Sequence, residues 1–171
     1  MFSRGLFGGI AAVALFALAP LTLQGQETTK DGQAMAGMGK RLVNVDGDNV
    51  AIKGYDPVAY FQQQKPVKGS SAHQVTFGGS IFYFASPENQ KLFEQDPAKY
   101  APQFGGFCGW AASQNYVYPA DPEIWQIQDG RLILNAAKSA QEKYNADPAG
   151  NLVKADRNWP GLVEKKGKPA P

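Results

Sequence analysis

The sequence predicts a small single domain of the α+β class, in which short antiparallel β-hairpins are interleaved with short helices. Three observations lead to this prediction: pairs of apolar segments around turns, repeated helix-start signals, and a high content of Gly and Pro. The chain has 171 residues, with 19 Gly and 12 Pro, a share well above the roughly 12% of an average protein. A chain so rich in turn residues is expected to form short elements rather than long helices.

Three hairpins are predicted from apolar segments that flank a turn. The turns are Asp46-Gly47, residues 78–80 and Asp129-Gly130. Asp-Gly between apolar segments is a hairpin signal, because both residues tolerate the backbone conformation that a tight turn requires. The corresponding strands are expected at 42–45 and 50–52, at 74–77 and 81–85, and at 125–127 and 132–134.

Helices are predicted where a capping residue precedes a proline. The side-chain oxygen of Ser or Asp accepts a backbone N–H at the helix start, and the fixed φ of Pro suits the first helical position. Five such pairs occur, at Asp56-Pro57, Ser86-Pro87, Asp96-Pro97, Asp121-Pro122 and Asp147-Pro148. The longest predicted helix covers residues 136–146.

The two ends of the chain are expected to lie outside the folded domain. Residues 1–25 are typical of a signal peptide, because Arg4 precedes an apolar run, Ile10 to Leu18, that is too short to span a membrane. Residues 26–41 are predicted to be a flexible leader, 42–162 the domain, and 163–171 a disordered basic tail. We therefore expect a periplasmic or secreted protein with no membrane attachment after signal cleavage.

Composition excludes several function classes. Lys plus Arg total 17 against 15 Asp plus Glu, which gives a net charge of +2. This near balance argues against a nucleic-acid partner, whose phosphates require many basic contacts. The single cysteine, Cys108, and the single histidine, His73, exclude an internal disulfide, a four-cysteine zinc site and an HExxH protease.

Cys108 and His73 are the candidate metal ligands. A thiolate and an imidazole together suit copper, zinc or another transition metal, and copper is the first choice. Two ligands are too few for a closed site, so a carboxylate, water or a methionine such as Met35 or Met38 would have to complete it.

Two other interpretations of Cys108 remain open. It lies between glycines and aromatic residues in the segment 104–110, where a cysteine can serve as a small buried hydrophobic side chain. It can also act as a reactive thiol if a base activates it. No catalytic residue is assigned, and a non-enzymatic protein is favoured.

Aromatic side chains suggest a different class of function. They are dense between residues 82 and 159, and most are expected to build the core of a domain with such short elements. The segment 158–160, Asn-Trp-Pro, is expected to fold back onto the domain. The alternative function is an accessory protein that binds a partner protein or a small apolar ligand by an aromatic face, with Cys108 purely structural.

Several blocks of the sequence resemble the secreted, stand-alone YHS-domain proteins of bacteria. The matching blocks are residues 51–61, 65–70, 82–86, 93–100, 102–108, 129–135 and 155–160. Related YHS modules accompany copper-transporting ATPases and multicomponent monooxygenases, so the resemblance implies a small YHS-like binding module that takes a transition metal. Relatives usually carry a cysteine where this sequence has Ala85, so here the predicted metal site depends on Cys108 and His73.

Overall fold

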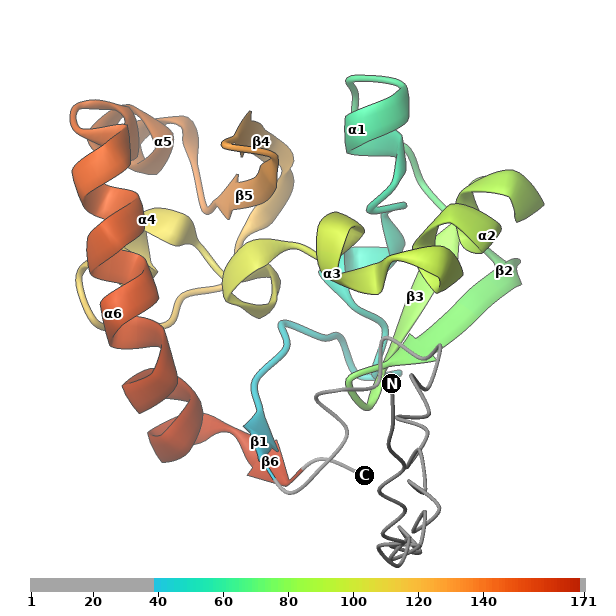
Figure 1. Cartoon of the computed structure of the whole chain (residues 1–171), viewed down its shortest axis with the longest axis horizontal. Helices are drawn as coiled ribbons and strands as arrows, with labels where there is room; N and C mark the ends of the chain where they lie inside the picture. The colour runs from blue at the N-terminus through green and yellow to red at the C-terminus, as the bar shows by residue number, and fades with distance from the viewer. Residues whose placement is uncertain (1–38, 170–171) are drawn as a thin grey trace, which may run out of the picture. The chain divides into compact units, whose positions relative to one another are not determined.

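Two of the three predicted hairpins organise the fold. In the computed structural model, which describes residues 39–169, β2 (Ser70–Phe77) pairs with β3 (Ser80–Phe84), and β4 (Asp121–Gln128) pairs with β5 (Arg131–Asn135). Both pairs are antiparallel, and short helices surround them (Figure 1). These elements confirm the α+β class. The predicted signal peptide and almost all of the leader lie outside the described residues.

The first predicted hairpin is wrong in extent. The turn at Asp46 exists, with the Asp46 carboxylate accepting from the Val50 amide at 2.9 Å, but only one isolated bridge, Val45 to Ala51, joins its two sides. Ile52 and Lys53 adopt positive φ angles of 44° and 54° within the 3-10 turn η1 (Ile52–Gly54), so the second strand cannot continue.

The folded part extends beyond the predicted boundaries at both ends. β1 (Lys40–Arg41) pairs antiparallel with β6 (Lys168–Pro169). Both strands lie outside the predicted domain of 42–162, and their paired residues are 127 or more positions apart in the chain, where no local pattern marks them.

Capping pairs predict most helix starts correctly. α2 (Pro87–Gln95), α3 (Pro97–Tyr100) and α6 (Pro148–Lys166) each begin at the proline, and the preceding Ser86, Asp96 or Asp147 accepts a backbone N–H. Asp56 likewise accepts from the backbone just before α1 (Ala59–Gln62).

Two helix predictions are corrected. Asp121-Pro122 begins strand β4 rather than a helix, because its chain pairs with β5. Among residues 39–169 the longest helix is α6 with 19 residues, whereas α5 (Lys138–Asn145) has 8. Leu152, Ala155 and Leu162 give α6 a buried face, which outweighs the unfavourable Pro160 inside the helix.

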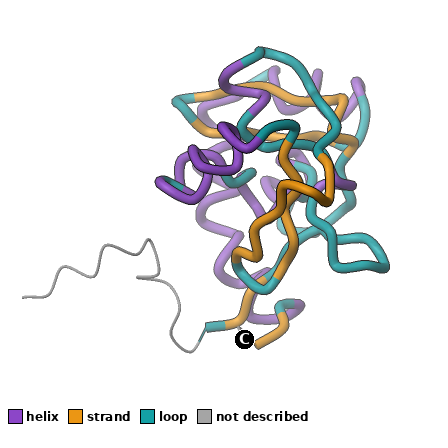
Figure 2. Tube along the Cα trace, turned by 90° about the vertical axis from the view of Figure 1, so that its right-hand side faces the viewer, coloured by secondary structure: helices purple, strands orange, loops and turns teal. Residues whose placement is uncertain are grey.

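The core consists of two hydrophobic clusters. One joins β3, α2 and β5, and includes Phe82, Phe84, Phe93 and Leu132. The other lies among η2 (Gln103–Gly106), α4 (Gly109–Ser113), α5 and α6. Figure 2 shows the loops and turns that link these short elements throughout. Within residues 39–169, no helix has the length and apolar character needed to cross a membrane.

Replacing Ser86 by Ala should lower the free energy of unfolding by about 1 kcal/mol, the usual cost of losing an N-cap. The Ser86 hydroxyl accepts from the Asn89 amide at 3.2 Å and so satisfies one N–H at the start of α2. Urea denaturation measures the change. Ser139→Ala is the control, since Ser139 is exposed inside α5; equal midpoints for the two variants would contradict the capping role.

Candidate functional site

Cys108 lies in the core, between η2 and α4. It is 2% exposed. Its backbone N–H donates to the Tyr118 carbonyl at 2.9 Å, and its backbone forms a parallel bridge with Leu134 of β5. This geometry matches one of the alternatives from the sequence, in which Cys108 is a buried side chain of the core.

The thiol contacts a buried carboxamide. Cys108 Sγ lies 3.6 Å from Asn135 Oδ1, which also accepts from the Trp110 amide at 3.1 Å. Asn135 therefore ties the start of α4 to the end of β5. Because Oδ1 is an acceptor, the S–H group is the donor in this contact.

Tyr144 lies in the second core cluster, close to the glycine that follows Cys108. Burial raises the pKa of Tyr144 to about 12, so the phenol stays protonated at neutral pH. Within the described part of the chain, Asn135 Nδ2 and Tyr144 Oη are buried without a hydrogen-bond partner. The surroundings of Cys108 are thus neutral polar groups embedded in apolar packing.

His73 has different neighbours. It lies half-buried on β2, which packs against β3 and α2. The pKa of Glu88 on α2 is lowered, chiefly by a backbone hydrogen bond and the Ser86 hydroxyl, and to a lesser degree by His73. α4, which begins directly after Cys108, packs against α5, α6 and β5, and Figure 1 shows it well apart from β2.

The described residues do not fit a closed metal centre. Among residues 39–169, no three side chains of His, Cys, Asp or Glu gather in a way that could hold a metal ion. Met35 and Met38 lie outside the described residues. Metal binding shared by Cys108 and His73 therefore stays a prediction.

Trp159 packs against the domain, held by hydrogen bonds of the preceding Asn158 and by contact with the Phe104 ring. Asn158 Nδ2 donates to the carbonyls of Ala112 and Ser113 at 3.0 and 3.1 Å. The Trp159 ring meets the Phe104 ring edge to face, with centroids 5.7 Å apart. The predicted fold-back of residues 158–160 is thus realised as part of a helix.

A cavity of about 440 Å³ lies beside Trp159. Four stretches of the chain line it: residues 40–43, the β2–β3 hairpin, the segment 101–105 and the C-terminal half of α6. Most of its lining is apolar: Leu42, Val43, Phe77, Phe82, Ala101, Pro102, Trp159, Pro160 and Val163. We call it the apolar cavity.

Backbone hydrogen bonds hold the first wall of the apolar cavity in place. The Asn44 amide donates to the Gly105 carbonyl at 2.8 Å, and Asn44 Nδ2 donates to the Gly106 carbonyl at 3.1 Å. These bonds fix the segment that follows β1 against η2, so this wall is formed before any ligand arrives.

Side-chain contacts hold the opposite wall. The Arg131 guanidinium donates to both carboxylate oxygens of Asp156 on α6, at 2.8 and 2.6 Å, and to Gln103 of η2 at 2.7 Å. Asp156 accordingly raises the pKa of Arg131. Helix α6 is therefore tied to the same 3-10 turn as the first wall.

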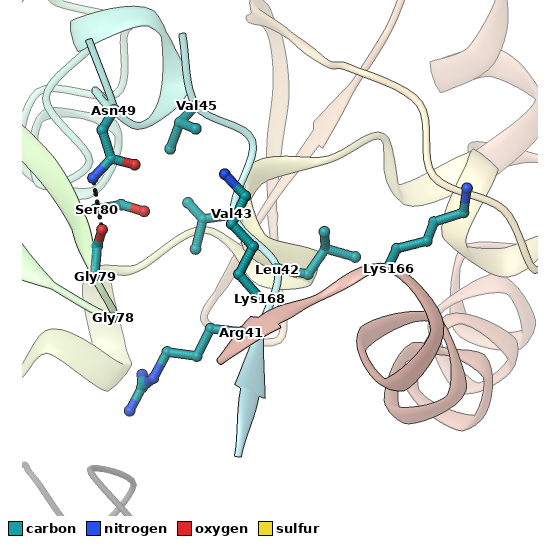
Figure 3. Close-up of a pocket in the computed structure, with 10 residues that line it drawn as sticks. All are labelled: Arg41, Leu42, Val43, Val45, Asn49, Gly78, Gly79, Ser80, Lys166 and Lys168. Atoms are coloured by element: carbon teal, nitrogen blue, oxygen red, sulfur yellow. Dashed lines mark hydrogen bonds between the residues drawn. The ribbon is translucent and has the colours of Figure 1, made fainter. Parts of the chain in front are cut away.

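A second cavity, of about 250 Å³, lies next to the apolar cavity (Figure 3). The two share Arg41, Leu42, Val43 and Gly78 in their linings. The second cavity also includes Lys166 and Lys168, and we call it the basic cavity.

Neither cavity could be predicted from the sequence. Phe82 and Trp159 belong to the aromatic region that the sequence singled out, but the other lining residues come from segments up to 124 positions apart. The segment 163–171, predicted to be a basic tail, supplies Lys166 and Lys168 of the basic cavity.

Comparison with known protein families identifies a YHS domain. The family model of the YHS domain matches residues 58–104, and no curated protein or solved structure matches the chain. The matched span contains Phe77, Gly78, Phe82, Ala101 and Pro102 of the apolar cavity. Cys108 lies outside it, so the matched region supplies one side of the cavity but not the thiol.

Proposed function

We propose that this chain, which is a YHS-domain family protein, is an exported, non-enzymatic module that binds a small apolar ligand in the apolar cavity. The observation that carries the proposal is the cavity itself, an apolar and aromatic hollow of about 440 Å³. Sites for small molecules are typically concave, mostly apolar and about 300–1,000 Å³ in volume. Export is proposed from the pattern of residues 1–25 alone.

Preformed walls support this proposal. The hydrogen bonds of Asn44 and the ion pair of Arg131 hold two sides of the cavity without a ligand. A rigid apolar site loses little conformational entropy on binding, so removal of apolar ligand surface from water contributes directly to affinity.

Binding of 1-octanol tests the proposal. We expect saturable binding by calorimetry, accompanied by a change in tryptophan fluorescence because Trp159 lines the cavity. Val163→Asp places a carboxylate in the wall and should weaken binding at least tenfold, since burying a charge beside apolar ligand is costly.

A matched variant on the same helix serves as the control. Val153→Asp makes the same chemical change at a position that is 66% exposed, and it should leave octanol affinity unchanged. Absence of saturable octanol binding, or equal losses in the two variants, would reject the proposed site.

Copper binding through Cys108 is the competing function, which the resemblance to YHS modules implies. In our proposal Cys108 is a core residue, so wild type and Cys108→Ser should bind copper(I) equally in a titration against a competing chelator. Serine keeps the size but lacks the soft thiolate. One equivalent of copper bound by wild type and lost in Cys108→Ser would instead establish the metal function.

A further inference from the structure

We propose that the ligand of the apolar cavity is an amphipathic anion, whose apolar body occupies that cavity and whose negative head group binds at the adjoining basic cavity. This inference rests on the proposed function and names its ligand class. An alkyl carboxylate of medium length is the simplest molecule with this chemistry.

The two cavities adjoin along one short segment. Arg41, Leu42 and Val43 line both, and so does Gly78 at the turn between β2 and β3. The apolar side of this boundary presents Phe77 and Phe82, while the other side presents Lys168 and polar backbone. A ligand that spans the boundary therefore meets an apolar environment at one end and a cationic environment at the other.

Charge at the boundary is strongly positive. Four cationic side chains line the two cavities: Lys40, Arg41, Lys166 and Lys168. Among the lining residues that the structure describes, Glu164 is the one carboxylate, and it pairs with Lys40 at 2.7 Å. The described lining of the two cavities is therefore predominantly cationic.

Figure 3 shows how three of these cations are oriented. The Lys168 side chain extends alongside Val43, whereas Lys166 points away from it. The Arg41 guanidinium lies close to Gly78. A Cβ added at Gly78 would lie 3.2 Å from Arg41 Nη1. Asn49 is held in the wall by donating to the Gly79 carbonyl at 2.7 Å. The Lys168 amine and the Arg41 guanidinium point in opposite directions, so Lys168, beside Val43, is the side chain placed to meet a head group.

Pairing with Lys168 should add modest, salt-sensitive affinity. Lys168 is exposed, and ion pairs at exposed sites are weak and are screened by salt. We expect octanoate, which is ionised at pH 7, to bind roughly three- to tenfold more tightly than octanol at low ionic strength. The preference should shrink at about 0.5 M salt, where screening acts over only a few ångströms.

The test compares octanoate with octanol on the full chain and on two charge variants. Lys168→Gln should weaken octanoate binding about threefold and leave octanol binding unchanged. Lys165→Gln removes the same charge from the end of α6 at a position outside both cavity linings, and it should leave both ligands unchanged.

The outcomes separate this inference from the proposed function. Equal affinity for octanol and octanoate would overturn the anion preference while the apolar site stands. Equal effects of Lys168→Gln and Lys165→Gln would also overturn it. The attraction of octanoate would then come from the general positive charge of this surface rather than from Lys168. Failure of both ligands to bind would remove the proposed site itself.

Discussion

Replacing Asp56 by Ala should lower the free energy of unfolding by about 3–5 kcal/mol, as expected when a buried side chain that accepts several hydrogen bonds is lost. Asp56 is fully buried. Its Oδ1 accepts from the amides of Val58 and Ala59 at 2.8 and 3.3 Å. Its Oδ2 accepts from the Ala85 amide at 2.8 Å and from Asn89 Nδ2 at 2.6 Å.

The size of this effect follows from what the carboxylate joins. It connects the turn before α1 to the segment 85–89, which leads from β3 into α2 and lies 29 to 33 positions further along the chain. Alanine would leave several buried N–H groups without an acceptor, and each unsatisfied buried donor costs about 1–3 kcal/mol before relaxation. Asparagine keeps the size and one acceptor oxygen, so Asp56→Asn should fall between wild type and alanine.

Urea denaturation monitored by circular dichroism measures these differences. Asp48→Ala is the control, because Asp48 is an exposed aspartate on a turn and its loss should change stability by less than about 0.5 kcal/mol. Similar midpoints for Asp56→Ala and Asp48→Ala would show that the buried carboxylate is not a structural junction.

Local chemistry explains what could be predicted from the sequence. A capping oxygen acts on N–H groups within three residues, so the starts of α2, α3 and α6 could be predicted from Ser86, Asp96 and Asp147. The turns of the β2–β3 and β4–β5 hairpins also depend on adjacent residues. Each of these features needs no knowledge of distant parts of the chain.

The capping signal predicts the wrong element where pairing with another strand determines the local structure. Asp121-Pro122 resembles the other capping pairs, and Asp121 does accept from the Glu123 amide at 3.0 Å. However, Asp121 also pairs with Asn135 across the hairpin, and the following Trp125 and Ile127 pack against the core. Strand pairing and burial therefore outweigh the helix-start signal at this position.

Prediction of the site was limited for a related reason. Deep burial of Cys108 was one of the alternatives drawn from the sequence, but its contact with Asn135 joins residues 27 positions apart. The apolar cavity depends on segments from both ends of the folded part, which no periodicity or motif connects. Its existence could be inferred only after β1 and α6 had been placed.

Gly105 is required both for the packing of the segment 42–44 on η2 and for the wall of the apolar cavity that this segment forms. It has a positive φ of 56°, and a Cβ added there would overlap the Leu42 carbonyl oxygen and press on the Val43 backbone. Gly105→Ala should therefore push the segment 42–44 away from η2 and break the bond from the Asn44 amide. Backbone strain and displacement together should cost about 3 kcal/mol or more.

Loss of ligand binding should accompany this loss of stability, because Leu42 and Val43 form one wall of the apolar cavity. The control is Gly130→Ala, since Gly130 has a similar φ of 73° but open space around a Cβ. This variant isolates the cost of the left-handed backbone, about 1–2 kcal/mol, and should retain octanol affinity.

If Gly105→Ala costs no more than Gly130→Ala and binds octanol normally, close packing of residues 42–44 on η2 does not build the cavity. If only Gly105→Ala loses binding while it remains folded, the wall formed by this segment is what the ligand requires.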